Sequence, residues 1–397
     1  MKVRENPPVH LTYCLNVHPG ETWEENFGAI KTMTLEIRDR VAPAQAFGLG
    51  LRLGHLAADS LASPETLNHF KAFLKKHNLY VFTINGFPYG DFHGSRVKEK
   101  AYHPDWRTRE RCDYTIRLAD ILSNLIPEGV SGSISTVPGS YKEWIKSDAD
   151  QAEMIQNLMI CVAHLSDIRA KTSQDLHLGL EPEPDCFLET TNDTVTFFTR
   201  ELGGQGRRYL AELKGCTEAE AGAMIARHLG VCFDTCHMSL QFENLPESIA
   251  LLKKHGIRLS KIQISTALRA ACQERSLARL ADFCDPVYLH QVRACCGADD
   301  ITSYRDLPGA LADKDMPKQV GEELRVHFHV PLYFAGYKEL GSTSADLTPD
   351  FFRNAIESGG AHFEIETYTF NVLPEVLKKR GIVASVCDEY GWVLNRL

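Results

Sequence analysis

The chain has 397 residues, of which 44% are hydrophobic and 24% are charged, and this composition excludes a disordered, collagen-like or low-complexity protein. Its 43 Lys and Arg residues against 52 Asp and Glu residues give a formal net charge of -9, so the protein has no general attraction to nucleic acid or to an anionic membrane. We therefore expect an enzyme-sized folded body that acts on a small molecule and not on nucleic acid.

Targeting signals and disulfide patterns are absent from the sequence. No stretch approaches the roughly 20 apolar residues that cross a bilayer, and the opening segment MKVRENPPVH has no apolar secretion core. The 12 cysteines are spread thinly, several in apolar runs, and no CxxC pair occurs. We predict a cytoplasmic protein with reduced thiols and no membrane insertion.

Short apolar or β-branched runs alternate with segments of helical period along the whole chain. Between the second and third runs, for example, Pro64-Glu65 opens a segment with Leu67 and Phe70 on one face, which is typical of an amphipathic helix. The runs that predict strands are residues 11–17, 47–53, 79–85, 133–137, 176–181, 230–234, 259–265, 324–330 and 361–367.

This alternation predicts an α/β protein built from successive strand and helix units around a parallel sheet. No GxGxxG turn follows the first run, which favours a closed (β/α)8 TIM barrel over an open dinucleotide-binding sheet. Residues 266–323 are too long for a barrel loop. We interpret them as an insertion after the seventh strand, mainly helical and with room for a hairpin, within a single domain that spans residues 1–397.

Polar residues close four of the late runs, where a barrel places its chemistry. They are Glu181, Asp234, Gln263 and Glu366. Carboxylate and amide oxygens at one mouth suit a divalent ion such as Mg²⁺ or Mn²⁺. One such carboxylate is as readily a helix cap. Four at corresponding positions favour a cation, because burying like charges without compensation is costly.

Several segments resemble a known superfamily. In chain order, LGLEPEP, FDTCHM, KIQIS and FEIETYTF resemble the ligand motifs of the xylose isomerase-like TIM barrels, which include sugar isomerases, ketose 3-epimerases, inosose dehydratases and endonuclease IV. The most specific element is an aspartate followed three residues later by a histidine. More narrowly, LTYCLNVHPGETW, NGFPYGDFHG and VHFHVPL resemble the E member of the Ebo metabolite-traffic family, EboE, which has this barrel and is encoded in clusters linked to metabolite export.

The resemblance implies roles for individual residues. Glu181, Asp234, Gln263 and Glu366 would bind a divalent ion, Mn²⁺, Mg²⁺, Co²⁺ or Zn²⁺. Glu181 and Glu366 would also act as acid and base, and His237 would bind a substrate oxygen. Gln263, where many members have histidine, matches the hydroxypyruvate isomerase-like branch.

Two histidines at spacing i, i+2 are further candidates. His327 and His329 share one face if residues 324–330 form a barrel strand, and a pair of hydrogen-bonded core histidines is the alternative. The opposite face carries Val326, Phe328 and Val330, which we expect to pack on the outer helices. A comparable late histidine in endonuclease IV-like relatives favours His329 as an extra metal ligand. We expect His327 to lie deeper in the barrel and to help bind the substrate.

Other residues at strand ends are candidates for binding substrate. His18 closes the first run, and Asn85 closes the third in a segment that also carries Phe87, Tyr89 and His93. Glu183 shares a face with Glu181 if the strand continues, although the proline between them predicts a turn equally well.

Three functions are consistent with these residues, since neither a GxSxG nor a GKS/T motif occurs. The first is a divalent-metal-dependent isomerase or epimerase acting on a sugar-like or polyol-like hydroxy-ketone. The second is a multi-metal phosphoester hydrolase of the endonuclease IV type, with His237, His327 and His329 as added ligands. The third is a barrel that binds a metabolite without turnover. Bound-metal stoichiometry separates the first two. The substrate and the oligomeric state stay open.

Overall fold

The computed structural model describes residues 1–90, 92, 97–295, 301–313 and 323–397. Its main sheet has nine strands, of which β1 (Lys2–Arg4) pairs antiparallel with β2 and the others pair in parallel. The predicted (β/α)8 barrel is confirmed, because a bridge between Cys14 and Gly50 closes the ring between β2 and β3. The parallel strands are β2 (Val9–Tyr13), β3 (Phe47–Arg52), β4 (Leu79–Asn85), β5 (Gly132–Thr136), β6 (Leu176–Leu180), β7 (Leu229–Asp234), β8 (Arg258–Ile264) and β14 (His362–Ile365).

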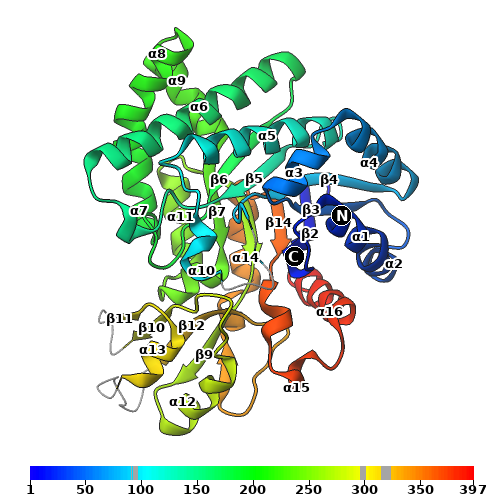
Figure 1. The fold of residues 1–397 in the computed structure, drawn as a ribbon, viewed down its shortest axis with the longest axis vertical. Coiled ribbons are helices and arrows are strands. Elements are labelled where there is room, and N and C mark those ends of the chain that lie inside the picture. The colour runs from blue at the N-terminus through cyan, green and yellow to red at the C-terminus, as the bar shows by residue number, and fades with distance from the viewer. Residues whose placement is uncertain (91, 93–96, 296–300, 314–322) are drawn as a thin grey trace.

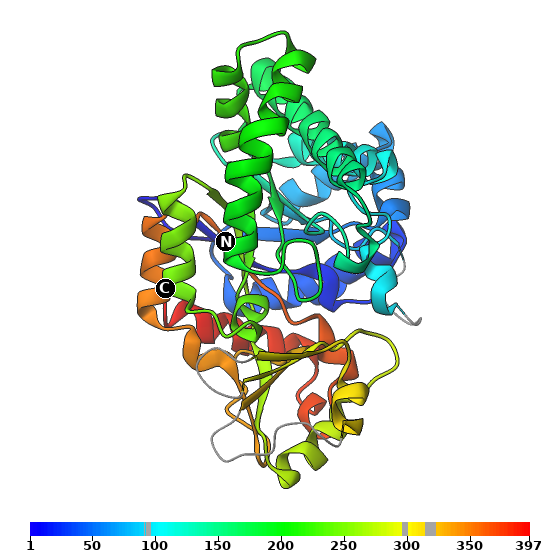
Figure 2. The ribbon, with the colours of Figure 1, turned by 90° about the vertical axis from the view of Figure 1, so that its left-hand side faces the viewer.

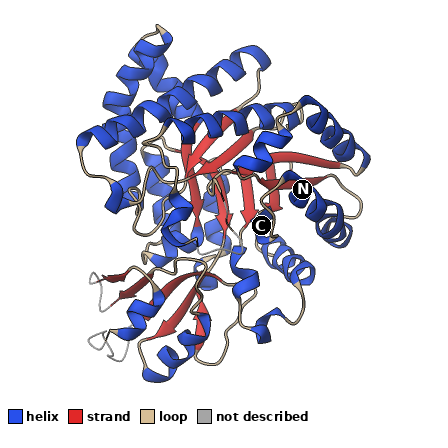
Figure 3. Ribbon diagram, viewed as in Figure 1, coloured by secondary structure: helices blue, strands red, loops and turns tan. Residues whose placement is uncertain are grey.

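Helices connect successive strands and surround the sheet (Figure 3). The local sequence sets where they begin: Ser63 caps α4 by accepting from the Thr66 amide, and Pro64 occupies its first turn. The helices of the barrel are α1 (Trp23–Ala29), α2 (Leu35–Val41), α3 (His55–Leu61), α4 (Pro64–Lys76), α5 (Arg109–Leu125), α6 (Asp148–Thr172), α7 (Thr191–Thr196), α8 (Arg207–Lys214), α9 (Glu218–His228), α10 (Thr235–Leu240), α11 (Leu245–Lys254), α14 (Pro349–Glu357), α15 (Glu375–Lys378) and α16 (Ile382–Leu394). Among the described residues, no helix is both long and apolar enough to span a membrane.

A second sheet lies between β8 and α14 in the chain and at the lower end of the molecule in Figures 1 and 2. Its five strands follow the order β11-β10-β12-β9-β13 and pair antiparallel. They are β9 (Ala267–Ala271), β10 (Val292–Cys295), β11 (Ile301–Tyr304), β12 (Glu323–His329) and β13 (Leu340–Ser342), with α12 (Glu274–Leu280) and α13 (Leu307–Ala312) beside them. The insertion is therefore built on a five-stranded sheet and is not mainly helical as predicted, and it reaches beyond residue 323.

Strand β12 corrects one expectation. Residues 324–330 do not form a barrel strand, because β12 pairs with β9 and β10 in the second sheet. The rings of Phe328 and His290 stack with their centroids 4.7 Å apart, and Phe328 also contacts the ring of Phe283. Phe328 therefore packs within the insertion and not on the outer helices. An apolar alternating run specifies a strand but not its partner, which explains the error.

The centre of the barrel is filled by a buried ion pair below the mouth. Lys261 Nζ lies 2.8 Å from Glu364 Oε2, and both side chains are fully buried. Lys261 also donates to Ser135 Oγ at 3.3 Å. A Cβ atom at Gly50 would lie 2.1 Å from Glu364 Oε1, so only glycine leaves room for this carboxylate. The cavity that could hold a ligand lies instead at the carboxyl ends of the strands.

Helix α16 fastens the inserted sheet to the barrel. The buried Glu389 carboxylate accepts from the Leu332 amide at 3.1 Å, just beyond β12, and from Thr367 Oγ1 at 2.6 Å, just beyond β14. Burial raises the pKa of Glu389 from 4.5 to about 7. The folded protein thus holds a proton on this residue at pH values where the unfolded chain has lost it.

We expect Glu389→Gln to flatten the dependence of stability on pH. The pKa of Glu389 is higher in the folded state than in the unfolded chain. The protonated carboxyl group therefore contributes fully to the free energy of unfolding below about pH 4.5, and this contribution is lost as pH rises through about 7. Urea unfolding in EDTA across this range measures it, with the exposed Glu128→Gln as control. Parallel profiles for wild type and Glu389→Gln would contradict the shift.

Candidate metal centre

Three carboxylates converge at the mouth of the barrel. Glu181 follows β6, Asp234 ends β7 and Glu366 follows β14. One oxygen from each lies within 4.8 Å of the others, and all three side chains are buried. The strand order β14-β8-β7-β6 explains the convergence, because the carboxyl ends of neighbouring parallel strands meet at one edge.

Hydrogen bonds fix the carboxylates of Asp234 and Glu366 in place. Asp234 Oδ1 accepts from the His237 amide at 3.0 Å and from Ser265 Oγ at 2.7 Å. Glu366 Oε1 accepts from Asn16 Nδ2 at 2.8 Å and from Asn85 Nδ2 at 3.1 Å. Asp234 Oδ2 and Glu181 Oε2 are buried and have no hydrogen-bond partner among the described residues. Buried carboxylate oxygens without donors are costly, so they indicate a site for a cation.

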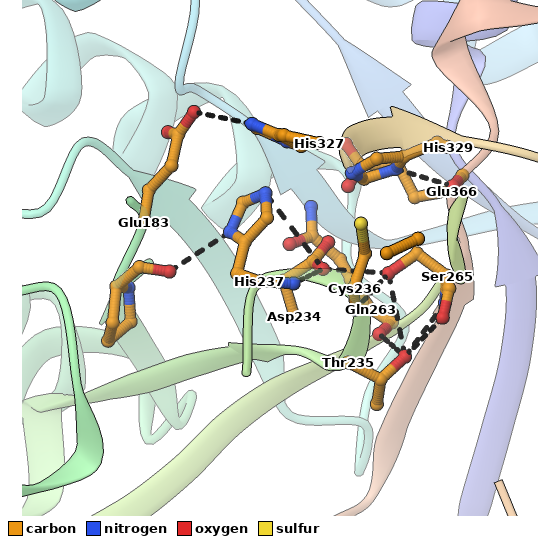
Figure 4. Close-up of polar contacts among 12 residues, drawn as sticks. Glu183, Asp234, Thr235, Cys236, His237, Gln263, Ser265, His327, His329 and Glu366 are labelled. Carbon is orange, nitrogen blue, oxygen red and sulfur yellow. Dashed lines mark hydrogen bonds and ion pairs between the residues drawn. The ribbon is translucent and has the colours of Figure 1, made fainter. Parts of the chain in front are cut away.

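Three imidazole rings lie around Asp234 (Figure 4). In each, Nδ1 donates to an oxygen: His237 to Pro182 O at 2.9 Å, His327 to Gln291 Oε1 at 2.7 Å and His329 to Glu366 O at 2.9 Å. This arrangement leaves the lone pair on Nε2, as in metal-binding histidines. The Nε2 atoms of His327 and His329 are buried without a partner in the described structure.

These histidines extend the carboxylate cluster into a chain of ligand atoms. Three further trios have atoms within 4.8 Å of one another: Asp234, His237 and His329; Glu183, His237 and His327; and Cys236, His327 and His329. Since His327 and His329 lie on β12, the inserted sheet contributes to this end of the site.

Gln263 lies beside the cluster in a different orientation from the one expected of a ligand. Its backbone is in register with Asp234 in β7 and with Glu364 in β14. Its Oε1 accepts from the Cys232 thiol at 3.0 Å, and its buried Nε2 has no partner in the part of the chain that the structure describes. To bind an ion, Gln263 must turn its amide and release Cys232.

The electrostatics of the cluster fit a divalent ion. Burial, and then the charges of Asp234 and Glu183, raise the pKa of Glu181. Burial, and then Glu181 and Asp234, raise the pKa of Glu366. Burial acts in the same direction on Asp234, but His237, His329 and hydrogen bonds outweigh it and lower its pKa. Without a cation, the raised pKa values of Glu181 and Glu366 favour their protonated forms, and a doubly charged ion would offset part of the negative charge when they ionise.

A cavity opens beside the cluster, and Glu181 and Glu366 are among its lining residues. The lining combines the carboxylates of the cluster, here called the floor, with many apolar and aromatic side chains. The lining residues are Asn16, Asn85, Phe87, Pro88, Phe92, Val97, Lys98, Ala101, Tyr102, Glu181, Glu183, His237, Tyr288, Leu289, His327, Glu366 and Tyr368.

Most of the residues predicted to bind substrate line this cavity. They are Asn85, Glu183, His237 and His327. His18 does not: its Nε2 is 2.9 Å from the hydroxyl of Tyr13, because the short helix η1 (Leu15–Val17) turns the chain and directs Asn16 to the floor instead. Tyr89 stacks on His55 with ring centroids 4.5 Å apart, and His93 lies outside the described residues.

Sequence reasoning missed several residues of the site. Asn16 follows the first strand and holds Glu366, and Tyr102 donates to Glu183 Oε1 at 2.8 Å. Gln291 orients both Tyr102 and His327. Asn16 and Tyr368 lie within segments that carried the resemblance, whereas Tyr102 and Gln291 come from connections without a motif.

Comparison with known proteins gives similarity to solved structures alone. No family model and no curated protein matches the chain. The probable 3-DHS dehydratase AsbF of Bacillus anthracis is 13% identical over 98% of this chain and 100% of its own, with a TM-score of 0.48. A xylose isomerase domain protein from Planctomyces limnophilus is 13% identical over 87% and 88%, with a TM-score of 0.48. An AP endonuclease of family 2 from Brucella melitensis is 17% identical over 65% and 79%, with a TM-score of 0.37.

The chain folds as a (β/α)8 barrel. That assignment rests on the strand pairing, and identities of 11–17% among the similar structures carry no activity over to this chain.

Proposed function

We propose that this protein is a divalent-metal-dependent isomerase or epimerase that acts on a sugar-like or polyol-like hydroxy-ketone. The observation that carries the proposal is the buried cluster of Glu181, Asp234 and Glu366, with unpaired carboxylate oxygens, at the floor of a cavity. Mn²⁺, Mg²⁺, Co²⁺ or Zn²⁺ would be held by these three residues, with Gln263 after its amide turns and with His329 as a further ligand.

The chain's own residues have separate tasks in this reaction. When bound, the ion supplies Lewis-acid polarisation of adjacent carbonyl and hydroxyl oxygens. Glu366, fixed by Asn16 and Asn85, and Glu181, across the cluster, move a proton between the two carbons of the substrate. His237 Nε2 lies 3.9 Å from Asp234 Oδ1, at the cluster, where it would hydrogen-bond a substrate oxygen. The surrounding burial excludes water from the reacting carbons.

Proton exchange tests this reaction class without knowledge of the natural substrate. Protein loaded with Mn²⁺ is incubated in D₂O with hydroxyacetone or dihydroxyacetone, and NMR follows deuterium at the carbon next to the carbonyl. We expect exchange that stops in EDTA and returns with Mn²⁺. Tight Mn²⁺ binding without any exchange in a wider set of neutral hydroxy-ketones would favour a barrel that binds a metabolite without turnover.

The three histidines favour one alternative, a multi-metal phosphoester hydrolase of the endonuclease IV type. Nε2 atoms of His237, His327 and His329 face a common region beside Asp234, where further ions could bind. One ion per chain supports the isomerase, whereas two or three ions together with hydrolysis of bis(p-nitrophenyl) phosphate support the hydrolase.

The remaining parts of the proposal concern the setting of the enzyme. The acidic net charge favours a small-molecule substrate over nucleic acid, and the reduced thiols favour a cytoplasmic location. The segments that resemble the Ebo family support a place in metabolite export. We treat residues 1–397 as one domain with an insertion from residue 266.

A further inference from the structure

The charges around the cavity favour an uncharged ligand. Among the described lining residues, Glu181, Glu183 and Glu366 are acidic, and Lys98 is the one lysine or arginine. Asp234 adds a fourth carboxylate at the floor, so a divalent ion compensates only part of this charge.

Lys98 has no hydrogen-bonding capacity left for a ligand. Its Nζ donates to Asp306 Oδ2 at 2.7 Å, to Tyr288 O at 2.6 Å and to Asp285 O at 3.4 Å. An ammonium group has three N–H donors, and these contacts use all of them. A phosphate or carboxylate on the substrate would therefore compete with Asp306 for Lys98 and would face the acidic floor.

Phe92, Tyr288 and Tyr368 form an aromatic part of the cavity lining, here called the roof. The ring centroids of Phe92, Tyr288 and Tyr368 lie 5.2–5.4 Å from one another, although the three residues come from three distant segments. Leu289 and Val97 continue the apolar surface beside them. A ligand that reaches from the carboxylates to this roof has its polar atoms at one end and an apolar group at the other.

We propose that the substrate is an uncharged hydroxy-ketone whose adjacent oxygens lie on the carboxylate floor and whose other end is a flat apolar group, about one ring in size, beneath Phe92, Tyr288 and Tyr368. This inference rests on the proposed function and narrows its substrate class. It separates this site from one built for sugar phosphates, which needs a free cation.

Three probes test the proposal by calorimetric titration of the Mn²⁺-loaded protein. Hydroxyacetone has the two oxygens alone, 2-hydroxyacetophenone adds a phenyl ring, and dihydroxyacetone phosphate adds a dianion. We expect 2-hydroxyacetophenone to bind about tenfold more tightly than hydroxyacetone, or better, because its ring is buried under the roof. We expect the phosphate to bind no more tightly than hydroxyacetone. Equal affinities of the two neutral probes, or preference for the phosphate, would overturn the proposal.

Variants locate the binding. Tyr288→Ala should remove most of the preference for the phenyl probe, and Tyr288→Phe should keep it. Ala101→Arg, at a partly exposed lining position, should strengthen binding of the phosphate about tenfold by adding a free cation. Mn²⁺ binding shows that each variant is folded. An unchanged phosphate affinity in Ala101→Arg, or an unchanged phenyl preference in Tyr288→Ala, would count against the assignment.

The test separates this inference from the proposed function. Mn²⁺ binding and exchange of hydroxyacetone without a phenyl preference would leave the proposed function and remove this inference. A phenyl preference in protein that fails to bind Mn²⁺ would remove the proposed metal-dependent function and leave the apolar binding site beneath the roof.

Discussion

We expect Asp234→Ala to abolish most metal binding and to leave the barrel folded. Asp234 belongs to two of the clusters of ligand atoms, so its loss should weaken Mn²⁺ binding by roughly 10²-fold or more, beyond the 10- to 100-fold typical of outer partners. The variant loses the cap of α10, which costs about 1 kcal/mol, but it also relieves repulsion among buried carboxylates. Calorimetry with Mn²⁺ and far-UV circular dichroism measure the two effects.

Asp234→Asn serves as the matched variant. It keeps an oxygen for the His237 amide and for Ser265, so the cap survives while the charge is lost. We expect its Mn²⁺ affinity to fall as well. Asp148→Ala, at an exposed position in the first turn of α6, is the control for removal of a carboxylate. Full metal content in Asp234→Ala would refute the site.

Glu366→Gln separates catalysis from metal binding. The glutamine keeps an oxygen that can accept from Asn16 and Asn85 and can contact the ion, but it cannot take up a proton. Proton exchange in D₂O should therefore fall by about 10²- to 10⁴-fold, the usual contribution of a general base. The loss in Mn²⁺ affinity should be much smaller.

Asn85→Asp is an informative comparison because it replaces a donor to Glu366 with a second acid. It should weaken the orientation of Glu366 without removing its carboxylate, so exchange should fall less than in Glu366→Gln. Small and equal losses of exchange and of metal affinity in Glu366→Gln would argue against its role as acid or base.

The sequence was sufficient to predict the barrel and the convergence of its carboxylates. Glu181, Asp234 and Glu366 each follow an apolar run, and parallel strands place such ends at one mouth whatever the details of packing. The shared face of His327 and His329 was also predictable, because it depends only on a spacing of two.

Features that depend on tertiary pairing were not predictable. Strand β12 reads like a barrel strand, yet its partners are β9 and β10, and periodicity carries no information about partners. One turn of 3-10 helix after β2 exchanges the expected roles of His18 and Asn16. Tyr102 and Gln291 reach the cavity from connections whose paths are set by long-range contacts.

Diffraction from crystals grown with Mn²⁺ tests the central claim most directly, by the anomalous signal of the metal. We predict one strong peak within about 2.0–2.2 Å of an oxygen from each of Glu181, Asp234 and Glu366. A second peak beside His327 would indicate the multi-metal alternative. The absence of any peak among these carboxylates at saturating Mn²⁺, with their oxygens hydrogen-bonded to one another instead, would contradict the account.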